Sequence, residues 1–238
     1  MEQLKCFADQ RHKAWCIHCR RTLGSVKANR DHVPTKKILR EPYPPNLPVV
    51  ETCEECNESF SLDEQYTVAF LSAVISGSVE PEDQIHPAGE RILSVNESLR
   101  SRIDGARKSY QTLGGEARQL WQPEQDRIDR VILKNARGHA FYELGEPMVD
   151  APIQIWSRPL LTLSTSELRD FEDREGGFAV WPEVGSRMMQ RLCSGEDLDG
   201  PWIVVQKGVY RYSVFVGDFI RVRSIIFDYL ATEVSWAG

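Results

Sequence analysis

The chain has 238 residues, and its hydrophobic content of 41% and charged content of 27% are those of an ordinary globular protein, so long disordered segments are not expected. No apolar run approaches the roughly 20 residues that span a bilayer, and the first residues lack the apolar core of a signal peptide. We therefore expect a cytoplasmic protein without a membrane partner. In a reducing compartment, paired cysteines favour metal binding over disulfides.

The net charge of −6 is unevenly distributed along the chain. Residues 1–40 hold ten Lys or Arg and three Asp or Glu, a local net charge of +7, so the remainder carries −13. A basic N-terminal region on an acidic body can direct a polyanion to one face of the protein. The alternative is a chance asymmetry on a solvated surface.

The first part of the chain predicts a strand, a loop, a strand and a helix. Residues 30–34 are expected to end a short strand, because Pro34 cannot donate to the hydrogen-bond ladder. A basic, proline-rich loop is expected over 34–46. The chain then returns as a strand over 46–50 and turns into a helix over 52–57.

The middle of the chain predicts helices. Ser61 and Glu64 fit a capping box that opens a helix ending near Gly77. An acidic linker is expected over 78–86. Apolar periodicity then predicts a helix over 88–111 and another from Pro123 to Gly145. His139, in the second helix, is expected to be a packed or surface residue rather than a ligand.

The last third is rich in strand patterns. An extended segment is expected over 150–163 and a short helix near 166–170, and then three strands joined by glycine-containing turns, at 202–206, 209–216 and 219–229. Aromatic and basic residues alternate along these strands. They could form a face that binds a nucleic acid strand, but half-buried pairs on an antiparallel sheet are the preferred interpretation. These residues are Tyr210, Tyr212, Arg221 and Arg223.

These patterns predict an α+β protein in three parts. Residues 1–78 form an N-terminal module that contains the paired cysteines, residues 79–150 a helical region, and residues 151–238 a β-rich accessory domain. The boundaries are placed at the acidic linker and at the change from helical to strand patterns.

Four cysteines are arranged as two Cys-x-x-Cys pairs, Cys16/Cys19 and Cys53/Cys56. Four thiolates at this spacing fit a closed tetrahedral zinc site. The alternative is a pair of redox or unrelated thiols. A zinc ion with four protein ligands has no open position for water, so we expect it to stabilise a segment too small for a core of its own.

An Asp-His dipeptide, Asp31-His32, lies between the two cysteine pairs, and Asn57 follows the last cysteine directly. A carboxylate and an amide oxygen are hard ligands that suit Mg²⁺ or Mn²⁺. A neutral imidazole beside them can remove a proton from water. A divalent cation with a general base is what phosphodiester hydrolysis requires. The non-catalytic alternative is that Asp31-His32 belongs to an ordinary surface turn.

The segments CIHC, RDH and NLPVVETCEECN together resemble HNH endonucleases of the ββα-metal fold, over about residues 12–75. They are most similar to the subgroup in which Asn follows the last cysteine, as in some phage junction-resolving endonucleases. The resemblance implies that Asp31 and Asn57 bind a catalytic Mg²⁺ or Mn²⁺ and that His32 is the general base. It also implies that Asn46 braces the loop behind the histidine. Many family members have His where this chain has Asn57, a difference that favours Mg²⁺ or Mn²⁺ over catalytic Zn²⁺.

Three cations, Lys36, Lys37 and Arg40, follow the Asp-His dipeptide closely. They are candidates for contacts with the phosphates that flank the scissile bond. The alternative is an ordinary solvated loop.

The sequence therefore predicts a metal-dependent endonuclease that acts on DNA. Its C-terminal two-thirds would serve dimerisation, the binding of a protein partner or the choice of the target. Family analogy favours bacterial restriction or antiphage defence. An RNA substrate stays open, because the catalytic motif contacts phosphate. The competing prediction is a non-catalytic, zinc-stabilised adaptor that binds nucleic acid or protein.

Overall fold

The computed structural model describes residues 12–45, 47–172, 178–179, 187–194 and 197–238. These residues form an α+β protein that divides into two compact units. The first unit combines Met1–Phe60 with Ile132–Gly238, and the second is Ser61–Val131. The first unit is thus built from two separate stretches of chain, whereas the expected three parts succeed one another along the sequence. Among the described residues, no helix is long and apolar enough to cross a membrane.

The N-terminal part of the first unit has the expected order of strand, loop, strand and helix. Strand β1 (Ala28–His32) pairs antiparallel with β2 (Val49–Cys53), so that Asp31 lies opposite Val50. Helix α1 (Glu54–Ser59) comes directly after β2. Short 3₁₀ turns occupy His12–Ala14, Leu23–Ser25 and Lys36–Ile38. The second strand begins later than expected and ends on Cys53.

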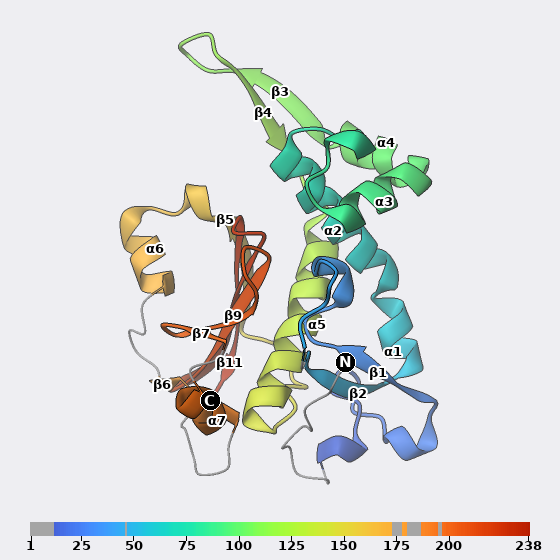
Figure 1. The fold of residues 1–238 in the computed structure, drawn as a ribbon, viewed down its shortest axis with the longest axis vertical. Coiled ribbons are helices and arrows are strands. Elements are labelled where there is room, and N and C mark those ends of the chain that lie inside the picture. The colour runs from blue at the N-terminus through green and yellow to red at the C-terminus, as the bar shows by residue number, and fades with distance from the viewer. Residues whose placement is uncertain (1–11, 46, 173–177, 180–186, 195–196) are drawn as a thin grey trace. The chain divides into compact units, whose positions relative to one another are not determined.

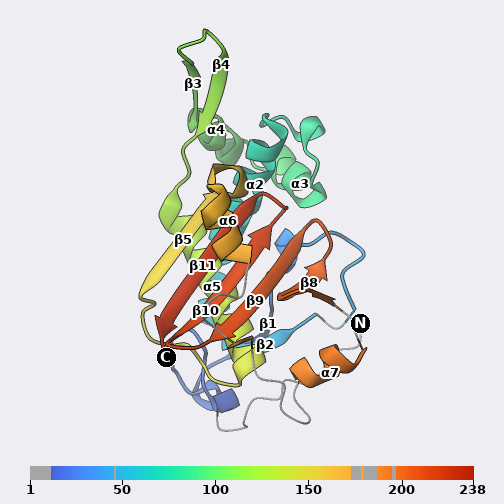
Figure 2. The same cartoon turned by 90° about the vertical axis from the view of Figure 1, so that its left-hand side faces the viewer.

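The C-terminal part of the first unit is an antiparallel sheet. In the described residues it has seven strands in the order β5-β11-β10-β9-β8-β7, with β6 pairing with β9. Figure 2 shows β5, β11, β10 and β9 side by side in this sheet. The strands are β5 (Gln154–Pro159), β6 (Phe178–Ala179), β7 (Leu198–Asp199), β8 (Trp202–Gln206), β9 (Tyr210–Val216), β10 (Phe219–Ile226) and β11 (Leu230–Ala237). Helix α6 (Thr165–Glu172) follows β5 in the chain, and helix α7 (Arg187–Ser194) follows β6.

One strand boundary differs from the expectation. The strand expected over 219–229 ends at Ile226, because Phe227 and Asp228 adopt left-handed φ angles of 57° and 47° and turn the chain back into β11. These residue types carry none of the Asn-Gly or Gly-x signals that usually announce such a turn, so the sequence did not reveal it.

The sheet has two buried faces, and the second half of α5 (Gln125–Leu144) covers one while α6 covers the other (Figure 1). On the α5 face, the ring of His139 stacks on Tyr212 with 3.6 Å between centroids, and its Nε2 lies 3.0 Å from the hydroxyl of Tyr210. His139 is therefore a packed residue, as expected. On the other face, Arg223 pairs with Glu233 at 2.6 Å.

An exposed aromatic and basic face, the less favoured interpretation of these strands, is therefore not formed. The two tyrosines and Arg223 are buried, and they lie on opposite faces of the sheet because residues alternate along paired strands. The interpretation as pairs packed in a sheet is the correct one.

The second unit contains α2 (Ser61–Ser76), α3 (Pro87–Val95), α4 (Glu97–Gly105), a hairpin of β3 (Arg107–Gln111) and β4 (Ala117–Trp121), and the first half of α5. The helix expected over 88–111 is wrong. The side chain of Asn96 accepts a hydrogen bond from the Leu99 N–H at 3.0 Å and so begins a new helix. After Gly105 the chain becomes a strand.

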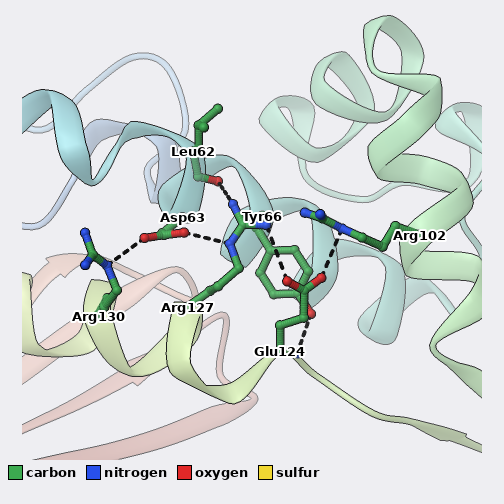
Figure 3. A network of polar contacts seen from close by, with 7 residues as sticks. All are labelled: Leu62, Asp63, Tyr66, Arg102, Glu124, Arg127 and Arg130. Atoms are coloured by element: carbon green, nitrogen blue, oxygen red, sulfur yellow. Dashed lines mark hydrogen bonds and ion pairs between the residues drawn. The ribbon is translucent and has the colours of Figure 1, made fainter.

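A polar network joins the starts of α2 and α5 within the second unit (Figure 3). Asp63 accepts hydrogen bonds from Arg127 and Arg130 at 2.6 and 2.8 Å. The guanidinium of Arg127 lies 4.6 Å from the ring centre of Tyr66, whose hydroxyl accepts the Glu124 N–H at 2.7 Å. The network orients the first turn of α5 against α2.

In the first unit, Gly138 on α5 lies directly against Val33, the residue after β1. A Cβ atom at Gly138 would lie 2.6 Å from Cγ2 of Val33 and 2.9 Å from its Cγ1. Val33 also belongs to a buried cluster with Ile17, Val50 and Phe141. The glycine therefore permits the close approach of α5 to the N-terminal part of the first unit.

We expect Gly138→Ala to destabilise the protein, although alanine is favoured over glycine in a helix by about 1 kcal/mol. The added methyl group overlaps a stiff branched side chain, and such overpacking costs about 1–3 kcal/mol. Urea and thermal unfolding measure the change. Gly105→Ala, at the end of α4 with no atom within 4 Å of the new Cβ, is the matched control and should be neutral or stabilising. Equal stability of both variants would contradict the close packing.

Candidate functional site

The four cysteines come together in the first unit. Cys16 and Cys19 lie on the turn before β1, Cys53 ends β2, and Cys56 lies in α1. Their Sγ atoms all lie within 4.8 Å of one another, with Cys19 and Cys53 at 3.6 Å. A tetrahedron with Zn–S bonds of about 2.3 Å has edges of about 3.8 Å. The expected cluster is confirmed, and its four sulfur donors fit a structural metal such as zinc.

Arg21 stabilises the thiolate form of this cluster. Its Nε donates to the Sγ of Cys19 at 3.3 Å, and its Nη2 lies 3.5 Å from Cys53 and 2.6 Å from a carboxylate oxygen of Glu55. Burial raises the pKa of Cys19, but hydrogen bonds from Arg21 and the neighbouring thiols prevail and lower this pKa to about 6. Burial raises the pKa of Cys56. Because metals bind thiolates, Arg21 favours metal binding.

Asp31 is buried, with 7% of its surface exposed, and its carboxylate faces α5. Its Oδ1 accepts a hydrogen bond from the Nζ of Lys134 at 2.9 Å, and both side chains are almost fully buried. The ammonium of Lys134 also lies 5.7 Å from the ring centre of Phe60. Sequence reasoning missed Lys134, because it lies 103 residues away in an ordinary helical pattern.

His32, the next residue, ends β1 and is half-buried. Burial lowers its pKa, and the positive charges of Lys36 and Lys134 lower it further. The imidazole is therefore neutral at pH 7, which is the form that can accept a proton.

Asn57 is held against β1 by its amide nitrogen. Its Nδ2 donates to the Oδ1 of Asn29 at 3.0 Å, and the same oxygen accepts the hydroxyl of Thr52 at 3.3 Å. Asn29 and Asp31 are two residues apart on one strand and so share a face. Asn57 therefore contacts the face of β1 that carries Asp31, at Asn29, two residues before Asp31.

The loop that carries the predicted phosphate contacts is packed. Ile38 and Leu39 are buried, and the backbone of Arg40 exchanges two hydrogen bonds with the side chain of Gln206, at 2.8 and 2.9 Å. Lys36 and Lys37 share the 3₁₀ turn, with the ammonium of Lys36 at 5.2 Å from the Tyr43 ring. The loop is therefore anchored by packing, while the phosphate contacts of Lys36, Lys37 and Arg40, which are partly exposed, stay a prediction. Asn46, the predicted brace, lies outside the described residues.

His18, between the two N-terminal cysteines, is a further buried imidazole that the sequence did not single out. Burial, together with the charges of Arg137 and Lys134, lowers its pKa to about 3. Its ring packs edge-on against Phe60 at 5.0 Å. It therefore contributes a neutral, apolar contact between the cysteine turn and α1.

No family model, curated protein or solved structure matches this chain.

We expect the purified protein to contain about one zinc ion per chain, as four cysteine ligands closing one tetrahedral site require. Cys53→Ser should lose the metal and lower the melting temperature, because the ion holds the turn, β2 and α1 together. Elemental analysis and thermal unfolding measure both effects. Cys193→Ser, at an exposed single cysteine, is the control and should retain the metal. A metal-free wild-type protein of unchanged stability would disprove the zinc assignment.

Proposed function

We propose that the protein is a metal-dependent endonuclease of the HNH type that hydrolyses phosphodiester bonds of DNA. The supporting observation is the position of Asp31 and His32 at the end of β1. This strand is paired with β2, and α1, which follows β2, contains Asn57 directly after Cys56, the last clustered cysteine. The cysteine cluster thus fixes the frame, and the Asp-His pair lies on it.

The residues that would hold the catalytic Mg²⁺ or Mn²⁺ are Asp31 and Asn57. Mg²⁺ keeps several waters and needs only one or two protein oxygens, so this small donor set is compatible with it. The Asp31 carboxylate already attracts a positive charge, the ammonium of Lys134 at 2.9 Å. Lys134 and a divalent cation therefore compete for the same carboxylate.

His32 would remove the proton from the attacking water. Its half-buried position and the nearby cations keep the imidazole neutral, so the ring is ready to accept a proton at pH 7. A bound divalent cation would neutralise the charge that develops on the phosphate and on the departing oxygen. Lys36, Lys37 and Arg40 would contact the flanking phosphates, and Asn46 would brace the loop.

The wider setting that we propose is bacterial restriction or antiviral defence in the cytoplasm, with the C-terminal sheet serving a protein partner or a homodimer. This part of the proposal rests on analogy with the family.

A second candidate function is a non-catalytic, zinc-stabilised adaptor for nucleic acid or protein. The observation that favours it is the Asp31–Lys134 ion pair, because a buried carboxylate with a lysine partner needs no metal ion. The two candidates predict different effects of replacing His32 or Lys134.

Plasmid cleavage in Mg²⁺ or Mn²⁺ tests the role of His32. His32→Ala should slow cleavage by about 10²–10⁴-fold, the usual contribution of a general base, while its zinc content and melting temperature stay those of the wild type. Glu51→Gln, an exposed change on β2, should cut normally. Equal cleavage by His32→Ala and wild type, or no cleavage of any DNA or RNA with any divalent metal, would refute the catalytic assignment.

Lys134→Met separates the two candidates. Removing one partner of a buried ion pair costs about 3–5 kcal/mol. Without added Mn²⁺, Lys134→Met should therefore melt at a lower temperature than the wild type. If Asp31 binds a divalent cation, Mn²⁺ should restore the stability of Lys134→Met more than it stabilises the wild type. The double variant Asp31→Asn/Lys134→Met is the control and should not respond to Mn²⁺. Destabilisation without rescue by metal would favour the adaptor.

A further inference from the structure

The hairpin β3–β4 of the second unit stands in solvent on both of its faces. Every residue of β3 is exposed, as are the first four of β4. Figures 1 and 2 show the hairpin extending away from α2, α3 and α4. A two-stranded ribbon with nothing packed on it is marginally stable at best in water. An arm of this kind is therefore expected to have a binding partner.

The base of the hairpin is firmly anchored. The ring of Trp121 packs edge-on against Phe70 at 6.4 Å, and the guanidinium of Arg107 lies 5.7 Å from the Trp121 ring centre and 2.8 Å from the carboxylate of Asp104. The Gln122 N–H also donates to the Ala106 carbonyl at 3.0 Å. The ribbon thus leaves the helices in a defined direction.

One face of the ribbon combines cations with apolar groups. Lys108 lies opposite Leu120, and Tyr110 lies opposite Arg118. Cross-strand partners and residues two apart share a face, so these four side chains form one patch. Tyr110 and Leu120 are 52% and 56% exposed. At the tip, Leu113 is fully exposed before Gly114 and Gly115.

The charge of the arm indicates the class of partner. Residues 106–122 hold three cations and one carboxylate, in a chain with a net charge of −6. Lys108 donates to the neutral side chain of Gln122 at 2.8 Å. Arg118 pairs with Glu116 at 2.8 Å, but both side chains are mostly exposed, and such surface pairs are worth little. Both cations are therefore available to a phosphate backbone.

We propose that the β3–β4 arm binds duplex DNA through the face formed by Lys108, Tyr110, Arg118 and Leu120. The major groove admits a two-stranded β-ribbon. The two cations would contact phosphates, while Tyr110, Leu120 and the tip residue Leu113 would make apolar contacts in the groove. The choice of DNA as the polyanion rests on the proposed nuclease function. A second copy of this arm is a poorer partner, because it would add the same positive charge.

The test measures DNA binding apart from cleavage. Fluorescence anisotropy with a labelled duplex, without added divalent cation and over a salt series, compares wild type with Lys108→Gln/Arg118→Gln. We expect affinity to fall by about 10-fold or more and the slope of log K against log salt to decrease by about 2, since each lost phosphate contact removes about 0.9 from the slope. Arg91→Gln/Arg169→Gln removes two exposed helical cations outside the arm and should leave both values unchanged.

A second pair of substitutions tests the apolar part of the patch. Tyr110→Ser/Leu113→Ser should weaken binding while leaving the salt slope unchanged, because neither residue carries charge. All these positions are exposed, so melting temperatures should match the wild type. A labelled single strand in place of the duplex shows which form the arm prefers, and stronger binding of the single strand would overturn the groove assignment.

The outcomes separate this proposal from the nuclease proposal. If wild type binds no duplex, or if the arm variants bind duplex as tightly as wild type, the arm proposal is overturned, whatever the cleavage assay shows. If the arm variants lose binding while wild type and His32→Ala cleave alike, the arm proposal stands and the catalytic one fails. If the apolar substitutions change the oligomeric state in light scattering but not DNA binding, the arm is a protein interface and the proposal is overturned.

Discussion

The buried ion pair between Asp31 and Lys134 is the interaction on which the first unit depends. A carboxylate removed from water is stable only when a partner compensates its charge, and Lys134 supplies that charge from α5 at 2.9 Å. One helical turn further along α5, Gly138 lets the chain after β1 pack closely, and His139 stacks on Tyr212 of the sheet. A single helix therefore contacts the N-terminal module and the C-terminal sheet, which explains why two distant stretches of chain form one unit.

This arrangement gives the cysteine cluster and the Asp-His pair different physical roles. The cluster is formed by the four cysteines and supported by Arg21, and the Asp31 carboxylate takes no part in it. The carboxylate, in contrast, is held by the ammonium of Lys134, which a divalent cation would have to replace in the function that we propose. Such an exchange would require a frame that keeps His32 and Asn57 in place, as preorganised catalysis does.

Local signals in the sequence predicted the parts of the structure that local interactions determine. The Cys-x-x-Cys spacing and the strand, loop, strand and helix order depend on residues close in the chain, and both were found. Lys134 could not be found, because its role depends on a contact 103 residues away. The hairpin at 107–121 was missed because its first strand continues the helical periodicity of α4, and β11 because Phe227 and Asp228 turn without a recognisable turn signal. A distant tertiary contact decides the first case. Cross-strand pairing in the hairpin and the left-handed backbone at Phe227 and Asp228 decide the other two.

The exposed hairpin addresses a difficulty that the proposed active site has on its own. A site built from one carboxylate, one amide and one imidazole would contact a phosphate and few other groups of the DNA. It would therefore contribute little binding energy that distinguishes one DNA from another. If both proposals hold, an arm on a second unit of the same chain would add contacts with DNA that take no part in the chemistry. Once one element held the DNA, the other would meet it at a high effective concentration, because the two are covalently linked. Affinity and cleavage would then be set by different residues, so that the catalytic residues would not also have to select the substrate.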